Sequence, residues 1–335
     1  MLQFLKFGMA YFCVAAILTL TMRQDGLTPL LWVWQSNMVL ATLMAKYAVI
    51  ALVVGTMLAV LTRTGTVGST IIAALAGAFG ALFFQSGFSL IKTSLPYIVP
   101  FYADPFFADL DFVLHGGSPP WKLVRQIMGG FPIDRLYVAY LHIWSIAAIC
   151  LPALVGALDN DAARVRRTII LYVTVWIILG NVFALMGMSA GPVYYDRLLG
   201  GERFADLTAA LLSDGVVASS IGVVQSELWN IYSEHGQSFG SGISAFPSVH
   251  VGIAVVVAIY FWERSRWLLP FGVAFAAIIL FLSVYTGYHY AVDGYVSVAF
   301  TVAVWRWLLH RDKKDIIRPN HSGALHGAVP GNSAA

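Results

Sequence analysis

Two histidines and one aspartate lie beside turn residues in the C-terminal half of the chain. His250 closes the stretch SAFPSVH, and His289 and Asp293 stand four residues apart in YTGYHYAVDGY. If a helix begins near His289, this spacing places the imidazole and the carboxylate on one face. The carboxylate can then orient the ring through one nitrogen and leave the other nitrogen free to attack. With one histidine as nucleophile and the other as general acid and then base, the set suits phosphoryl transfer through a phosphohistidine.

Ser248 stands where the chain turns into an apolar run, so it marks the start of a helix. The free backbone N–H groups and the dipole of a helix N terminus favour a bound anion. We therefore expect Ser248 and these N–H groups to cradle a phosphate. The alternative is purely structural, because interfacial histidines and His–Asp hydrogen bonds four residues apart also occur without catalysis.

The composition indicates an integral membrane protein. Of the 335 residues, 59% are hydrophobic and 11% charged, and the mean hydropathy is +0.76. Soluble proteins carry about 25% charged residues. The net charge of +3 is spread over short loops, which gives no support for nucleic-acid binding. Cys13 and Cys150 both fall in apolar runs, so we expect no structural disulfide.

Apolar runs long enough to cross a hydrocarbon core of about 30 Å set the predicted architecture. We predict an all-α polytopic protein of about eight transmembrane helices, with the first kept as an uncleaved span. The predicted spans are residues 4–22, 38–61, 67–90, 134–157, 168–188, 248–263, 268–286 and 292–309. The span after His250 is short for a crossing. Lys46 lies inside the second span, where snorkelling or a helix–helix bond is the simplest explanation.

The distribution of Lys and Arg orients these spans, because short cytoplasmic loops are enriched in basic residues. Under an eight-span count one side carries Lys6, Arg63, Arg164, Arg166, Arg167, Arg264, Arg266, Arg311, Lys313 and Lys314. We expect that side to be cytoplasmic and to hold both termini. Residues 91–133 and 189–247 then lie outside a plasma (inner) membrane, on the same face as His250, His289 and Asp293.

The first outer segment contains the start and stop signals of two short helices. Asp104 stands at an N-cap position before Pro105, and Gly116 follows as a stop. Ser118 and Pro119 repeat the pattern, ending at Gly129. We predict two interfacial helices on the outer leaflet, whose acidic residues Asp104, Asp109 and Asp111, with His115, are solvated. The tail, residues 311–335, is polar and rich in small residues, which predicts disorder.

The motifs PSVH and HYAVD resemble the type-2 phosphatidic acid phosphatase superfamily. Its lipid phosphatase branch has Pro-Ser-Gly-His, then Ser-Arg-x5-His-x3-Asp. Val249 replaces the glycine here, and Ser283 occupies the arginine position. These departures resemble the branch of inositol phosphorylceramide synthases, as do SAGPVYYDRL (189–198) and residues 91–116. By this resemblance His250, His289 and Asp293 match the catalytic triad.

The resemblance also implies a domain plan. Residues 1–90 form three N-terminal spans, and the third of these is the first helix of a six-helix core. Residues 91–133 form the outer interfacial segment, 134–310 the phosphatase-like membrane core with the catalytic motifs, and 311–335 a cytoplasmic tail.

The missing arginine leaves the phosphoryl charge without an obvious counter-ion. The candidate cations on the outer side are Lys92, Lys122, Arg125, Arg135, Arg197 and Arg203. Arg197 is best placed, because its loop leads to the His250 motif. Lys92 begins a Lys-x6-Val-Pro stretch with the spacing of the superfamily's first motif, but it stands two spans too early in the chain. Tyr194 and Tyr290 complete the candidate phosphate- and substrate-binding residues.

We therefore expect a metal-independent membrane enzyme, without cofactor, that transfers a phosphoryl or phospho-headgroup at the outer leaflet. Its partners would be the bilayer, a phospholipid or sphingolipid substrate and an alcohol or water acceptor. The alternatives are a plain phosphatase of lipid phosphates or polyprenyl diphosphates, a metal-dependent hydrolase with His and Asp ligands, and a lipid transporter that binds a headgroup without chemistry. The sequence does not define the oligomeric state.

Overall fold

The protein was described from a computed structural model, which defines residues 1–23, 25–35, 67–127, 134–234 and 242–317. Within these residues the secondary structure is entirely helical. The α-helices are α1 (Leu2–Met22), α3 (Val67–Ser94), α4 (Asp104–Leu114), α5 (Pro120–Ile127), α6 (Asp134–Val138), α7 (Trp144–Leu158), α8 (Ala162–Thr174), α9 (Ala184–Met186), α10 (Pro192–Leu199), α11 (Ala205–Ser213), α12 (Ser220–Ser233), α13 (Val249–Arg264), α14 (Leu269–Tyr285) and α15 (Ala291–Ile317). Two short 3₁₀ turns, η1 (Leu95–Tyr97) and η4 (Arg266–Leu268), and two π-helical stretches, η2 (Ala139–Ile143) and η3 (Val175–Phe183), join or extend them.

The polytopic helical architecture is confirmed. Six stretches of the described residues are long and apolar enough to cross a membrane: Leu2–Met22, Gly68–Tyr97, Leu136–Leu158, Ala162–Met186, Arg266–Tyr285 and Ala291–Lys314. The 16 residues of α13 span about 24 Å, which is shorter than a typical hydrocarbon core. The predicted second span, residues 38–61 with Lys46, lies outside the described residues, as does the chain after residue 317.

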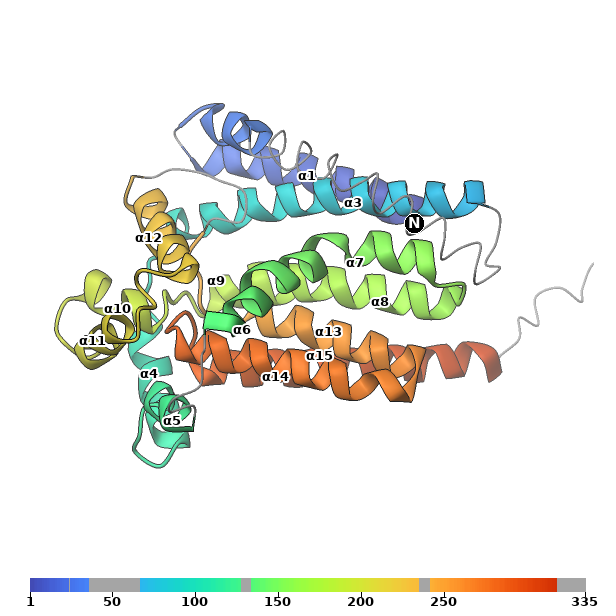
Figure 1. The fold of residues 1–335 in the computed structure, drawn as a ribbon. Helices are drawn as coiled ribbons and strands as arrows, with labels where there is room; N and C mark the ends of the chain where they lie inside the picture. Colours follow the sequence, from blue (N-terminus) through green and yellow to red (C-terminus); the bar gives the residue numbers. More distant parts are fainter. Residues whose placement is uncertain (24, 36–66, 128–133, 235–241, 318–335) are drawn as a thin grey trace, which may run out of the picture.

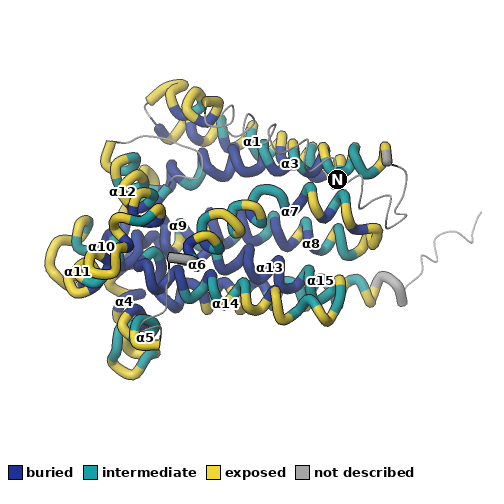
Figure 2. The backbone as a smooth tube through the Cα atoms, in the orientation of Figure 1, coloured by how far each residue is buried: buried dark blue, intermediate teal, exposed yellow. Residues whose placement is uncertain are grey.

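Helix α13 forms the centre of the bundle. It contacts α7, α8, α14 and α15, and its residues from Val251 to Ala258 are all buried (Figure 2). Small residues allow the close approach of α14: a Cβ at Gly272 would come within 2.6 Å of the Ala258 Cα. Because neighbouring helices cover α13, it can be shorter than the lipid-facing spans. On the other side of the bundle α1 packs on α3, and α3 packs on α7 (Figure 1).

The two ends of the bundle differ in build (Figure 1). One end, which we call the loop end, carries α4, α5 and α10 to α12 together with the connection from α14 to α15. The other, which we call the opposite end, carries the short connections from α7 to α8 and from α13 to α14. His250 and His289 belong to the loop end, because α13 starts there and α14 finishes there.

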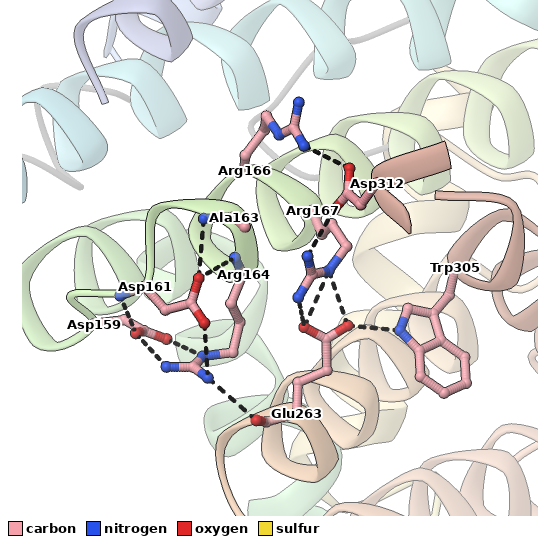
Figure 3. Close-up of polar contacts among 9 residues, drawn as sticks. All are labelled: Asp159, Asp161, Ala163, Arg164, Arg166, Arg167, Glu263, Trp305 and Asp312. Atoms are coloured by element: carbon pink, nitrogen blue, oxygen red, sulfur yellow. Dashed lines mark hydrogen bonds and ion pairs between the residues drawn. The ribbon is translucent and has the colours of Figure 1, made fainter. Parts of the chain in front are cut away.

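Charged side chains at the opposite end form a closed ion-pair network (Figure 3). Arg167 of α8 reaches Glu263 of α13 at 2.6 Å and Asp312 of α15 at 2.7 Å. The indole N–H of Trp305 donates to Glu263 at 2.6 Å. Arg164 pairs with Asp159 at 2.5 Å. The network ties three core helices together where they leave the bundle.

The two short helices of the first outer segment exist as α4 and α5, but two details of the prediction are wrong. Asp104 is the first residue of α4, whose N-cap is Ala103, and Asp104 does not cap its own helix. Nor are all the acidic residues of α4 solvated: Asp104 and Asp111 are 0% and 3% exposed. Seven residues apart, they share the helix face that packs inward, whereas the side chain of Asp109 is 70% exposed.

Candidate active site

The fold brings His250, His289 and Asp293 together at the loop end. His250 lies in the first turn of α13, His289 in the connection between α14 and α15, and Asp293 in the first turn of α15. The ring centroids of the two histidines are 5.9 Å apart, with their planes inclined by 59°. Two imidazoles from different elements therefore face a common space, as nucleophile and acid–base require.

A backbone carbonyl fixes the tautomer of His289. Its Nδ1 lies 2.7 Å from the carbonyl oxygen of Ala245 and 3.3 Å from Oδ2 of Asp293. A carbonyl oxygen can only accept, so Nδ1 carries the proton and donates it. The lone pair of the neutral ring is then on Nε2. The ring is 7% exposed, and this orientation is the one that a nitrogen nucleophile needs.

Burial, and secondarily the positive charge of Lys92, lower the pKa of His289 to about 3, while the hydrogen bond with Ala245 opposes the shift. The imidazole is therefore neutral at neutral pH and keeps its lone pair. The positive charge of Lys92 also acts on His250.

Asp293 connects the segments that carry His289 and Ser248, through its side chain and its backbone carbonyl. Its Oδ2 accepts the backbone N–H of Tyr290 at 3.0 Å, beside the contact with His289. Its backbone carbonyl accepts the N–H of Ser248 at 3.2 Å, which joins the two motifs. Oδ1 is buried and has no hydrogen-bond partner among the described residues. One carboxylate oxygen thus retains accepting capacity next to His289.

His250 rests on aromatic rings that sequence reasoning missed. Trp144 stacks on it with centroids 3.8 Å apart and planes inclined by 20°, and Tyr140 stacks at 5.0 Å and 4°. The indole N–H of Trp144 also donates to the His250 carbonyl at 2.9 Å. The stack and the hydrogen bond together fix the position of the His250 ring at the start of α13. The only available signal was the pair of aromatic residues four positions apart. Tyr140 lies in the π-helical stretch η2 and Trp144 begins α7, and π-helical turns are frequent at functional sites.

Ser248 is the N-cap of α13, and its side-chain oxygen accepts the N–H of Val251 at 3.4 Å. Since its own N–H is bonded to Asp293, Ser248 shapes the helix start and offers no backbone donor to a ligand. The N–H groups of Val249 and His250 have no partner within the described chain, as is usual in a first helical turn. These two N–H groups are therefore the backbone donors available to the anion cradle that the sequence predicts.

The candidate cations lie in different surroundings. Lys92, at the end of α3, is half-buried, forms no ion pair with a described carboxylate, and has its Nζ 5.7 Å from the ring of Phe88. Arg197 is exposed and stacks on Trp229 at 5.5 Å. Three others are paired with acidic residues: Lys122 with Asp206, Arg125 with Asp214 and Arg203 with Asp109. The side chain of Arg135 lies outside the described residues.

The two candidate tyrosines have structural partners. Tyr194 of α10 donates to the backbone carbonyl of Gln225 at 2.9 Å and stacks on Trp229. Tyr290 donates its hydroxyl to Asp104 at 2.8 Å. Burial, and then the neighbouring Asp104 carboxylate, raise the pKa of Tyr290 well above its usual value. Both phenols therefore stay protonated and act as hydrogen-bond donors.

Helix α4 braces the site with the two carboxylates that were interpreted as solvated. Asp104 accepts the N–H groups of Ala190 and Gly191, each at 2.8 Å. Asp111 accepts those of Ala291 and Val292 at 2.7 and 2.9 Å, and so caps α15. Burial raises the pKa of both carboxyl groups, and these backbone bonds oppose the shift.

Ser189 connects the braced segments to the His250 motif. Its backbone carbonyl accepts from Ala245 at 2.7 Å, and its hydroxyl accepts from the N–H of Phe246 at 3.1 Å. Gly191 has a φ of +92°, and a Cβ there would come within 2.4 Å of the Tyr288 carbonyl oxygen. Only glycine allows residues 189–191 to pass so close to the chain that carries His289.

No group of three or more His, Cys, Asp or Glu side chains suited to a metal ion occurs among the described residues. A sequence model of the family described as the PAP2 superfamily matches residues 131–307, which include both motifs and all of α7 to α14. No match was found to a curated protein or to a solved structure.

Proposed function

The chain belongs to the PAP2 superfamily, and on that premise we propose that it transfers a phosphoryl or phospho-headgroup between a lipid and an alcohol or water through a phosphohistidine on His289. Superfamily membership and the membrane-spanning helices fit a membrane lipid phosphatase or phosphotransferase. The observation that carries the proposal is the hydrogen bond from Nδ1 of His289 to Ala245, because it leaves Nε2 as the reactive atom.

In the first step, the Nε2 lone pair of His289 attacks phosphorus while the bond from phosphorus to the leaving oxygen breaks. His250 gives its proton to that oxygen, because an alkoxide is a poor leaving group. In the second step, neutral His250 takes a proton from water or an alcohol, whose oxygen attacks phosphorus as the bond to Nε2 breaks. Asp293 orients His289 and stabilises the positive charge on the phosphorylated ring.

We assign the counter-ion for the phosphoryl group to Lys92 in preference to Arg197. Lys92 lies close enough for its charge to act on His289, and no described carboxylate neutralises it. Lys92→Ala should lower kcat/KM about 10²-fold, as expected when one stabilising donor is lost, and Lys92→Arg should recover part of that loss. Arg197→Ala is the matched control and should change kcat/KM by less than about threefold. A larger loss from Arg197→Ala than from Lys92→Ala would reverse the assignment.

The acceptor separates a transferase, akin to the inositol phosphorylceramide synthase branch, from a plain phosphatase. The decisive measurement is mass spectrometry of products formed by the purified protein from a panel of phospholipids and sphingolipids, with and without alcohol acceptors. A new phosphoester that requires the alcohol would establish transfer, and release of phosphate alone would establish hydrolysis. Inhibition by vanadate and resistance to chelators would support the metal-independent mechanism. Binding without any product would favour a transporter.

We also propose that the loop end faces the outside of the plasma (inner) membrane and that both termini are cytoplasmic, from the asymmetry of Lys and Arg. A cysteine introduced at Gly201, in the loop between α10 and α11, should react with an impermeant reagent on intact cells. A cysteine at Arg166 should not. Labelling at position 166 alone would invert the topology.

A further inference from the structure

An apolar groove of about 410 Å³ opens beside the candidate active site. It lies between the start of α4, the end of the span that contains α8, η3 and α9, and the His250 motif. Its walls include Tyr102, Phe106, Phe107, Phe183, Met186 and Phe246. Aromatic and thioether side chains of this kind bind hydrocarbon and offer little to a polar ligand.

The inner wall of the groove is continuous with the catalytic loop. Phe246 follows Ala245, whose carbonyl orients His289. The ring of Phe107 stacks on that of Phe246 with centroids 4.3 Å apart and lies 6.1 Å from the ring of Tyr290. A Cβ at Gly187 would come within 2.5 Å of the Phe246 ring, so that ring lies directly against the backbone. The groove therefore begins at Phe246, the residue next to the one whose carbonyl orients His289.

The mouth of the groove is formed by exposed apolar side chains. Phe106 and Met186 are 62% and 68% exposed. The hydroxyl of Tyr102 donates to the Met186 carbonyl at 2.5 Å, which links the segment before α4 to α9. In a membrane protein, such surfaces face lipid chains. The groove thus connects the catalytic loop with hydrocarbon.

We propose that this groove binds the hydrocarbon chain nearest the phosphate of the lipid substrate. The inference rests on the proposed function, because a phosphate held at the two histidines leaves its lipid chain to run back towards the membrane. The groove begins beside the loop that holds His289 and ends on the exposed apolar surface, and it supplies that route. It would place the chain against Phe246 and Phe107, and so align the scissile bond with Nε2 of His289.

A second apolar groove of the described chain serves as a contrast. Its volume is also about 410 Å³, and it lies between α13, α14 and α15, with Trp262, Val273 and Trp305 among its walls. Trp262 is twelve residues beyond His250 on α13, which is about 18 Å along the helix axis. A chain in this second groove would contact the protein without positioning a phosphate at the histidines.

The test compares two substrates in Met186→Ala, Phe106→Ala and Val273→Ala proteins. One is the dioleoyl form of the phospholipid that the wild type turns over best, and the other is nitrophenyl phosphate, which has no chain. We expect the first two variants to lose about tenfold in kcat/KM on the dioleoyl lipid, the scale of small losses in an apolar pocket, and to keep their activity on nitrophenyl phosphate. Val273→Ala, an exposed apolar residue of the second groove, should match the wild type on both.

Equal losses on the two substrates, or no loss from Met186→Ala and Phe106→Ala, would overturn the groove assignment and leave the proposed function intact. No turnover of any phosphoester by the wild type would refute the proposed function, and the groove assignment with it. A second measurement uses the unaltered protein and the same phospholipid with a diazirine on its acyl chain. Crosslinks concentrated at residues 102–107 and 183–187 support the assignment, and crosslinks as frequent at residues 255–280 contradict it.

Discussion

The buried carboxylates beside the candidate site and the carboxylates at the other end of the bundle have different hydrogen-bond partners. At the opposite end, Glu263 and Asp312 both pair with Arg167 (Figure 3). Around the candidate site, Asp104 and Asp111 accept from neutral backbone N–H groups. The ion pairs of Arg167 neutralise charge and join helices. The backbone hydrogen bonds to Asp104 and Asp111 order loops and do not use the positive charge of Lys92.

This difference would allow one bundle to combine a rigid frame with the proposed active site. Arg164, Arg166 and Arg167 at the opposite end are paired with carboxylates, so they have little affinity left for a phosphate. At the loop end Lys92 has no carboxylate partner among the described residues, and one oxygen of Asp293 is unpaired within the described chain. An anionic substrate can pair with Lys92, and substitutions at the two ends should separate catalysis from stability.

The largest expected effect is the loss of the nucleophile. His289→Ala should lower turnover by about 10⁴-fold or more, since positioning by the remaining residues cannot replace the attacking nitrogen. Product formation on the best lipid of the panel is the measurement. His142→Ala, which removes an exposed histidine of η2, is the control and should remain active. Full activity of the His289→Ala protein would eliminate the phosphohistidine mechanism.

The second effect depends on the leaving group. His250→Ala should lower activity on a natural lipid by about 10²- to 10⁴-fold, the usual range for general acid–base catalysis. The first-turnover burst from a nitrophenyl ester should fall much less, because nitrophenolate leaves without a proton. Rapid mixing resolves this burst from the slower second step. If the burst and the lipid reaction fall alike, His250 is not the acid.

A smaller loss is expected when the brace on α15 is weakened. Asp111→Asn keeps the shape of the side chain but replaces one accepting oxygen with an amide group, so Ala291 or Val292 loses its hydrogen bond. We expect kcat to fall about 10-fold to 100-fold, because Asp293 and His289 would be less well aligned. Asp109→Asn, on the exposed face of the same helix, should have no effect. Equal kinetics for the two variants would show that α4 does not position the site.

The smallest effect on catalysis is expected at the opposite end. Arg167→Ala leaves Glu263 and Asp312 without their shared partner, so the free energy of unfolding should fall by about 1–3 kcal/mol. Thermal unfolding in detergent would register this as a lower Tm, while kcat/KM below that temperature should change by less than about threefold. A loss of activity comparable with that of Asp111→Asn would mean that the two ends are coupled.

The helices, and the position of the two histidines at one end of the bundle, could be predicted because both leave local signals. Apolar length marked the spans, and His250 and His289 stood out as polar residues beside turns at helix ends. The hydrogen bond from His289 to Ala245 could not be predicted, because every residue has a carbonyl and only the folded chain shows which one is near. The proximity of Lys92 to His289 was hidden by the long chain separation between them. The burial of Asp104 and Asp111 was missed because a short amphipathic helix with acidic residues reads as a surface helix unless its partner segments are known.

The brace formed by α4 also has a consequence for the order of biogenesis. Asp111 is synthesised 180 residues before Ala291, whose backbone N–H it accepts. During synthesis, most of the spans are therefore inserted before Asp111 can form its hydrogen bonds with Ala291 and Val292. These bonds can form only once the final span has been made. The geometry of the candidate site is then the last part of the protein to form. A chain released before its final helix would have most of its membrane-spanning segments and no reactive centre, so incomplete products would be inert towards the surrounding lipids.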